Sequence, residues 1–128
     1  MDKAEPFYDQ LMPILGFDLA RKGGGYVAEH DFRVVEYFHD NIVIGINSPW
    51  EKFKGAVVHR RRPGSVHHLA FRAANVEEVD EVFEQIKAIG AEIIEEPKYF
   101  PQHGEAYYAC FFKDPDGIKL EVMFEERD

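Results

Sequence analysis

The sequence has little cysteine, no long apolar run and far fewer basic than acidic residues. A single cysteine, Cys110, excludes an intrachain disulfide framework and a zinc site built from cysteines alone. No segment approaches the roughly 18–20 apolar residues of a membrane span, and residues 1–6 lack the layout of a signal peptide. The 15 basic and 24 acidic residues give a net charge of −9, which disfavours nucleic-acid binding. We therefore expect a cytoplasmic protein with no nucleic-acid or membrane partner.

Two helices are predicted from apolar periodicity and end signals. Apolar residues recur at helical spacing after Pro6, and this series ends at Gly16. A second series follows Asn75, which with Glu78 has the pattern of a capping box, and it ends at Gly90. The length of 128 residues and the 45% hydrophobic content suit one domain.

Short alternating runs predict the strands, and glycine or proline clusters predict the turns between them. We interpret Gly23–Gly25 as a flexible turn, residues 97–105 as a loop and residues 114–117 as the turn of a hairpin. The predicted strands cover residues 26–28, 32–38, 42–46, 66–73, 92–95, 107–113 and 118–124.

The two halves of the chain repeat one pattern. Each half has a helix, a glycine and three strands, and 74 residues separate Gly16 from Gly90. In the second half a strand precedes the helix, and its counterpart would fall before Met1. We expect an α+β fold of two βαβββ modules in which the first module lacks its opening strand, through truncation, an alternative start or a lineage deletion. One domain would span residues 1–128, with an incomplete first module (1–46), a linker (47–64) and a second module (65–128).

Three segments resemble the vicinal oxygen chelate superfamily, which includes glyoxalase I, bleomycin-resistance proteins, fosfomycin-resistance enzymes and extradiol dioxygenases. They are Val66-His67-His68-Leu69-Ala70-Phe71-Arg72, Asp114-Pro115-Asp116-Gly117-Ile118-Lys119-Leu120-Glu121 and Phe7-Tyr8-Asp9-Gln10-Leu11. The resemblance implies a curved mixed sheet around a cleft that holds one divalent metal ion. It also implies that His68 and Glu121 are metal ligands. Zn, Ni, Mn and Fe all suit this donor set, and a metal-free protein is the alternative.

The strand pattern itself places Glu121 on a definite face. A three-residue loop at 115–117 would pair Phe111 with Glu121, on the face that carries polar side chains, and would direct Cys110 into the core. The first-module counterpart of Glu121 is Gly45, and the counterpart of His68 lies in the absent strand. Other side chains, or a partner subunit, could replace these two ligands; the candidates in this chain are Glu36, His39 and His103.

Ordinary structural roles compete with each functional interpretation. His68 could be a hydrogen-bonded strand histidine, and Glu121 could pair with Arg72 or Lys119 on a solvated face. His67 is expected to be a buried imidazole rather than a ligand. The basic run at 59–62 is either a solvated linker or an anion site. The residues expected to contact a substrate are Phe111, Tyr107, His103 and Arg72.

The hypothesis that follows is a metal-dependent enzyme of the lyase or isomerase type, in which Glu121 moves the proton and the metal ion chelates vicinal oxygens of a small molecule. The alternative is a metal-free drug-binding protein of the bleomycin-resistance type, and a third possibility is a truncated product without activity. The missing strand would expose a sheet edge, so we expect a homodimer.

Overall fold

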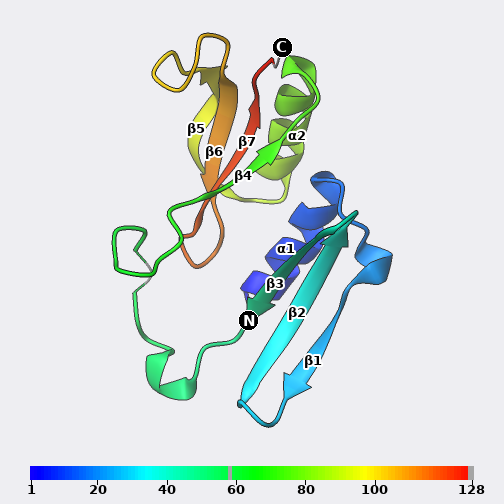
Figure 1. The fold of residues 1–128 in the computed structure, drawn as a ribbon, viewed down its shortest axis with the longest axis vertical. Coiled ribbons are helices and arrows are strands. Elements are labelled where there is room, and N and C mark those ends of the chain that lie inside the picture. The colour runs from blue at the N-terminus through cyan, green and yellow to red at the C-terminus, as the bar shows by residue number, and fades with distance from the viewer. Residues whose placement is uncertain (58, 127–128) are drawn as a thin grey trace. The chain divides into compact units, whose positions relative to one another are not determined.

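The computed structural model describes residues 1–57 and 59–126 and divides into two compact units, Met1–Val57 and Val58–Asp128. We describe each unit by itself (Figure 1). The boundary between them falls within the segment predicted as a linker, residues 47–64. Within the described part of the chain, no helix is both long enough and apolar enough to cross a membrane.

The first unit contains one long helix and a three-stranded antiparallel sheet in the order β1-β2-β3. Helix α1 packs on strand β2, because the ring of Tyr8 lies 6.4 Å from that of Tyr37, whose hydroxyl donates a 2.9 Å hydrogen bond to Asp9. The elements in chain order are α1 (Ala4–Ile14), the 3-10 helix η1 (Leu19–Arg21), β1 (Gly23–Val27), β2 (Phe32–His39), β3 (Ile42–Asn47) and the 3-10 helix η2 (Glu51–Phe53).

The prediction that Gly23–Gly25 form a turn is wrong, because these glycines open strand β1. Gly24 has a φ of +126°, and a Cβ atom built there would collide with the backbone carbonyl oxygen of Val34 in β2. Glycine at this position lets the two strands approach closely with a backbone conformation that other residues avoid.

The second unit contains one helix and a four-stranded sheet in the order β4-β7-β6-β5. Strand β4 runs parallel to β7, and the other pairs are antiparallel. The elements in chain order are β4 (Leu69–Arg72), α2 (Val76–Ala88), β5 (Glu92–Tyr99), β6 (Tyr108–Lys113) and β7 (Lys119–Phe124). Strand β4 is shorter than the predicted 66–73, and β5 extends to Tyr99 with register shifts on either side of Glu95 that accommodate Pro97 on an edge strand.

Helix α2 begins as the sequence predicts. The Asn75 side chain accepts a 2.7 Å hydrogen bond from the Glu78 N–H, and the Glu78 carboxylate accepts one from the Ala74 N–H. The helix covers the sheet face that carries Tyr108, because the Tyr108 hydroxyl donates to Asp80 of α2 at 2.7 Å. Cys110 shares that face and is fully buried, as expected from the strand pattern.

The hairpin between β6 and β7 has the predicted turn and register. The Asp114 carboxylate accepts hydrogen bonds from the N–H groups of Asp116 and Ile118, and Gly117 has a φ of +90°. Phe111 pairs directly with Glu121 as a result.

The α+β class and the repeat are confirmed: each unit has a helix followed by three antiparallel strands. The units differ at one edge. Strand β7 has β4 beside it, whereas in the described residues no strand pairs with the corresponding edge of β3 (Figure 1).

Candidate functional site

Glu121 is the buried charged group at the centre of the four-stranded sheet. Its neighbours in β7, Leu120 and Val122, lie on the face covered by α2, so the alternation of the strand puts Glu121 on the other face. Ala70 of β4 and Phe111 of β6 are its register partners. The residue is only 2% exposed, and a buried carboxylate requires hydrogen-bond donors.

Two side chains approach its oxygen atoms, one on each oxygen. The hydroxyl of Tyr107 donates a short hydrogen bond to Oε2 of Glu121, and Nε2 of His68 lies 3.2 Å from Oε1. His68 comes one residue before β4, and its side chain is 36% exposed. The structure therefore brings the two predicted metal ligands together, and Glu121 pairs with neither Arg72 nor Lys119.

Tyr107, which is predicted to contact a substrate, contacts Glu121 in this structure. Burial, and then the hydrogen bond to Glu121, raise the pKa of Tyr107 well above its usual value, so this hydroxyl remains a donor throughout the neutral range. The bond to Glu121 was not predicted from the sequence, although the alternation of the predicted strand 107–113 puts residue 107 on the same face as Phe111.

Apolar side chains lie on the same sheet face as the carboxylate. A buried cluster on this face consists of Phe100, Ala109, Phe111 and Met123, and Tyr107 packs against it. The Lys119 amine lies 4.5 Å from the centre of the Phe111 ring, a cation–π contact. Phe111 thus lies beside Glu121, as predicted, while Lys119 places a positive charge on the same sheet face.

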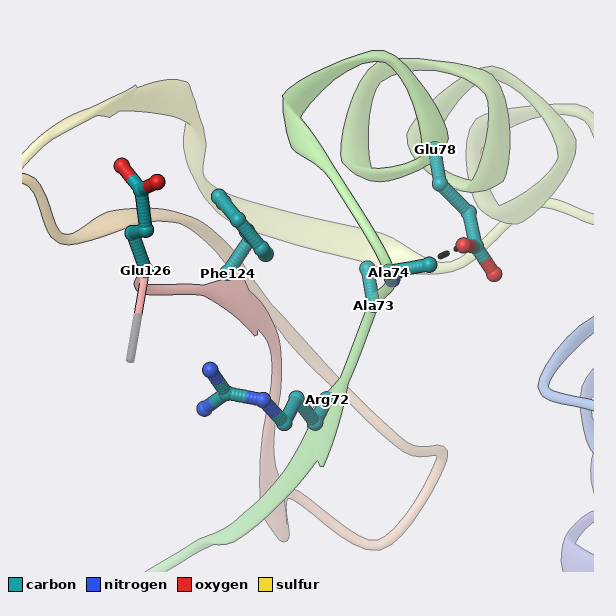
Figure 2. Close-up of a pocket in the computed structure, with 6 residues that line it drawn as sticks. All are labelled: Arg72, Ala73, Ala74, Glu78, Phe124 and Glu126. Carbon is teal, nitrogen blue, oxygen red and sulfur yellow. Dashed lines mark hydrogen bonds between the residues drawn. The ribbon is translucent and has the colours of Figure 1, made fainter. Parts of the chain in front are cut away.

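The other two residues predicted to contact a substrate, His103 and Arg72, make their described contacts with residues other than Glu121. The exposed His103 ring is 5.3 Å from Tyr107 and 5.8 Å from Phe100, so it reaches Glu121 only through Tyr107. Arg72 extends into a shallow open hollow at the end of β4 (Figure 2). Its guanidinium donates to the backbone carbonyl of Glu125 and lies over the Phe124 ring.

The expectation that His67 is buried is wrong. His67 is exposed, because it precedes the shortened strand β4, and its Nδ1 atom lies 2.7 Å from Nδ1 of His68. Desolvation, followed by the charges of His68, Lys119 and two arginines of the basic run, lowers the pKa of His67. These interactions favour the neutral imidazole at neutral pH.

The first unit has glycine, and no carboxylate, at the position of β3 that corresponds to Glu121. Gly45 of β3 pairs with Glu36 of β2, on the face away from α1. The His39 ring packs against Phe17 at 5.2 Å. In residues 1–57 and 59–126, no group of three or more histidine, cysteine, aspartate or glutamate side chains converges as a metal site.

Comparisons of the chain with known proteins agree with this architecture. A family model described as Glyoxalase/Bleomycin resistance protein/Dioxygenase superfamily matches residues 1–122. The Bacillus subtilis protein YqjT is 32% identical over 89 residues, which cover 70% of this chain and 69% of YqjT.

Solved structures of similar fold include a candidate glyoxalase from Bacillus halodurans, with 29% identity, a TM-score of 0.75, and coverage of 98% of this chain and 87% of that one. The fosfomycin resistance protein FosX from Listeria monocytogenes, complexed with Mn(II) and a sulfate ion, has 20% identity and a TM-score of 0.63, with coverage of 98% and 84%. At that identity the likeness to FosX concerns the fold.

Proposed function

The chain belongs to the Glyoxalase/Bleomycin resistance protein/Dioxygenase superfamily, and from this premise we propose that it is a metal-dependent enzyme of the lyase or isomerase type. Its substrate would be a small molecule with two neighbouring oxygen atoms. His68 and Glu121 would hold the divalent ion, which is Zn, Ni, Mn or Fe. The observation that carries the proposal is the 3.2 Å approach of the His68 Nε2 atom to a buried carboxylate oxygen.

His68 and Glu121 would supply two donors to a divalent ion, and because the described residues bring no third ligating side chain to them, water or substrate oxygens would complete the coordination. Ligand distances of about 2.0–2.2 Å and ordinary coordination angles hold two donor atoms on one ion about 3 Å apart, close to the observed 3.2 Å. One imidazole and one carboxylate suit the metals named. These two side chains leave coordination positions for water and for substrate oxygens. FosX, a protein of similar fold, holds a Mn(II) ion, which supports a divalent metal as the bound ion.

A metal ion bound there would act as a Lewis acid that polarises the substrate oxygens. The protein's own side chains would do the rest. Tyr107 donates to Oε2 of Glu121 and so orients the carboxylate. The Glu121 carboxylate would also hold or move the substrate proton while it is not coordinated to the ion. The apolar cluster around Phe111 and Met123 would limit the access of water to the carboxylate.

Metal binding by matched variants tests the proposal. The protein is purified without chelator, its metal content is measured, and the stripped protein is titrated with Zn²⁺, Ni²⁺ and Mn²⁺. We expect one ion per chain in the wild type and its loss in His68→Ala and in Glu121→Gln. The controls His59→Ala and Glu105→Gln change exposed residues of the same unit and should retain the ion.

A second candidate function is a metal-free protein that binds a small molecule such as a drug. It is favoured by Gly45, which stands where the repeat would put a second carboxylate. The net charge of −9 would attract a cationic ligand. If the wild type takes up no metal and none of the three ions raises its melting temperature, the enzyme proposal is wrong and this alternative takes its place.

We also propose that the protein is a homodimer in which the open edge of β3 pairs with a second copy of the chain. In the second unit the corresponding edge of β7 is covered by a strand. The segment Ile42–Asn47 contains no charged residue and no proline to protect it. Ile42 and Val43 are 53% and 50% exposed, as expected for a surface that a further strand would cover.

A further inference from the structure

Glu36 is a half-buried carboxylate on β2, the central strand of the three-stranded sheet. The acidic residues of α1 are paired: Glu5 contacts Lys22 at 2.6 Å and Arg33 at 2.7 Å, and Asp9 contacts Lys22 at 2.9 Å. Among the described residues, by contrast, Glu36 has neither a hydrogen bond nor an ion pair. Every fully buried polar side-chain atom in the described part of the chain has a hydrogen-bond partner, so the unpaired oxygen atoms of Glu36 are reachable from outside.

Glycine lies opposite Glu36 on both neighbouring strands. Gly23 of β1 and Gly45 of β3 are its register partners. Side chains that are directly opposite in adjacent strands are close enough to cover each other, and here both are missing. Neighbouring strands are about 4.8 Å apart, so the uncovered stretch from β1 to β3 is roughly 10 Å wide. A small aromatic molecule has about this length.

The side chains that share this face with Glu36 are largely apolar. Strand alternation puts Val34 and Phe38 of β2 on the face away from α1, together with Val43, the register partner of Phe38. The face already carries one planar cation, because the Arg21 guanidinium lies 5.3 Å from the centre of the Phe38 ring. An unpaired carboxylate among apolar side chains favours a ligand that combines a positive charge with an apolar body.

We propose that this face of the first unit is a binding site for a small aromatic amine, whose ammonium group donates to the Glu36 carboxylate and whose ring lies across Gly23 and Gly45. The net charge of −9 would attract such a cation. The three residues belong to one unit, and the proposal does not depend on metal binding by the second unit. It gives Gly45, which cannot be a metal ligand, the role of leaving room for the ring.

Two substitutions test the two parts of this site. Glu36→Gln removes the charge and keeps the shape of the side chain. Gly45→Val fills the space beside it: a Cβ atom there would meet Glu36 and Val34 at the ordinary distance of 4.0 Å. Gly45 has no positive φ and valine suits a strand, so we expect this variant to fold. Glu29→Gln is the matched control, because Glu29 is an exposed acid between β1 and β2. Thermal unfolding of each variant precedes any titration.

Three indoles that share one ring system and differ in charge are the probes: tryptamine is a cation at neutral pH, tryptophol is neutral and indole-3-acetate is an anion. Each is titrated into nitrogen-15-labelled protein in EDTA, and the backbone amides of Gly23 and Gly45 are followed by NMR. A hydrogen bond to a charged group strengthens binding about 10–100-fold. We expect this advantage for tryptamine over tryptophol, and no binding of indole-3-acetate.

The variants should divide these effects. In Glu36→Gln tryptamine should bind no more tightly than tryptophol, in Gly45→Val both should bind at least about 10-fold more weakly, and Glu29→Gln should behave as the wild type does. The proposal is overturned if the wild type does not prefer tryptamine, if either site variant binds it as tightly as the wild type, or if the amides that shift belong to the second unit. EDTA removes metal ions, so failure here leaves the metal proposal standing, and absence of metal uptake leaves this site standing.

Discussion

Replacing Tyr107 by phenylalanine tests the central contact of the candidate site. The substitution removes one oxygen atom and keeps the ring that packs against the buried cluster. Its direct effect is the loss of the hydrogen bond that Tyr107 donates to Oε2 of Glu121. The carboxylate is then left with His68 as its remaining contact among those described here.

The size of the effect follows from the burial of the acceptor. A hydrogen bond to a charged group contributes about 1.5–3 kcal/mol to stability. Glu121 is 2% exposed, so water replaces the lost donor poorly. Tyr107 itself is half-buried, which allows some rehydration. We expect Tyr107→Phe to lower the free energy of unfolding by about 2 kcal/mol.

Urea unfolding followed by circular dichroism, in EDTA at neutral pH, measures the change. Tyr99→Phe is the matched control, because that tyrosine is 56% exposed, and it should alter the free energy of unfolding by less than about 0.5 kcal/mol. In a Glu121→Gln background the acceptor is neutral, so Tyr107→Phe should cost only about 1 kcal/mol. If Tyr107→Phe costs no more than Tyr99→Phe, the hydroxyl does not hold the carboxylate and the reasoning is wrong.

Three further predictions concern the rest of the chain. Gly24→Ala should lower the free energy of unfolding in urea by about 2–4 kcal/mol, because the added Cβ atom meets the backbone of β2. The control Gly55→Ala, whose Cβ atom meets nothing within 4 Å, should change it by less than about 0.5 kcal/mol, and equal effects would contradict the close approach of β1 and β2. Burial raises the pKa of Cys110 from 9.0 to about 12, so a disulfide reagent at pH 8 should label the thiol only in urea, and rapid labelling of the folded protein would refute this. Because the thiol ionises first in the unfolded chain, its contribution to the free energy of unfolding should fall as the pH rises from 9 towards 12. If β3 pairs with a second copy, Val43→Lys should shift the protein from dimer to monomer in sedimentation velocity while Val57→Lys, at a residue 70% exposed, leaves the dimer intact; a monomeric wild type would end the dimer proposal.

The sequence alone determined the elements whose signals are local. Helix α2 follows from its apolar stripe and from Asn75, which caps it through a hydrogen bond three residues away. The turn at 114–117 fixes the pairing of Phe111 with Glu121, because a turn sets the register of the strands that it joins. From that register the face of Glu121 follows directly, as does the burial of Cys110 on the other face.

The tertiary structure decided the features that depend on contacts between distant residues. Gly23–Gly25 have the composition of a turn, yet they form part of strand β1. At Gly24 the backbone of β2 comes so close that a Cβ atom would collide with it. Tyr107 is 14 residues from Glu121 in the chain, and no local pattern indicates that its hydroxyl would bind a carboxylate. His67 is exposed because β4 starts only at Leu69. Local rules act over a few residues, whereas these contacts form only after the sheet has assembled.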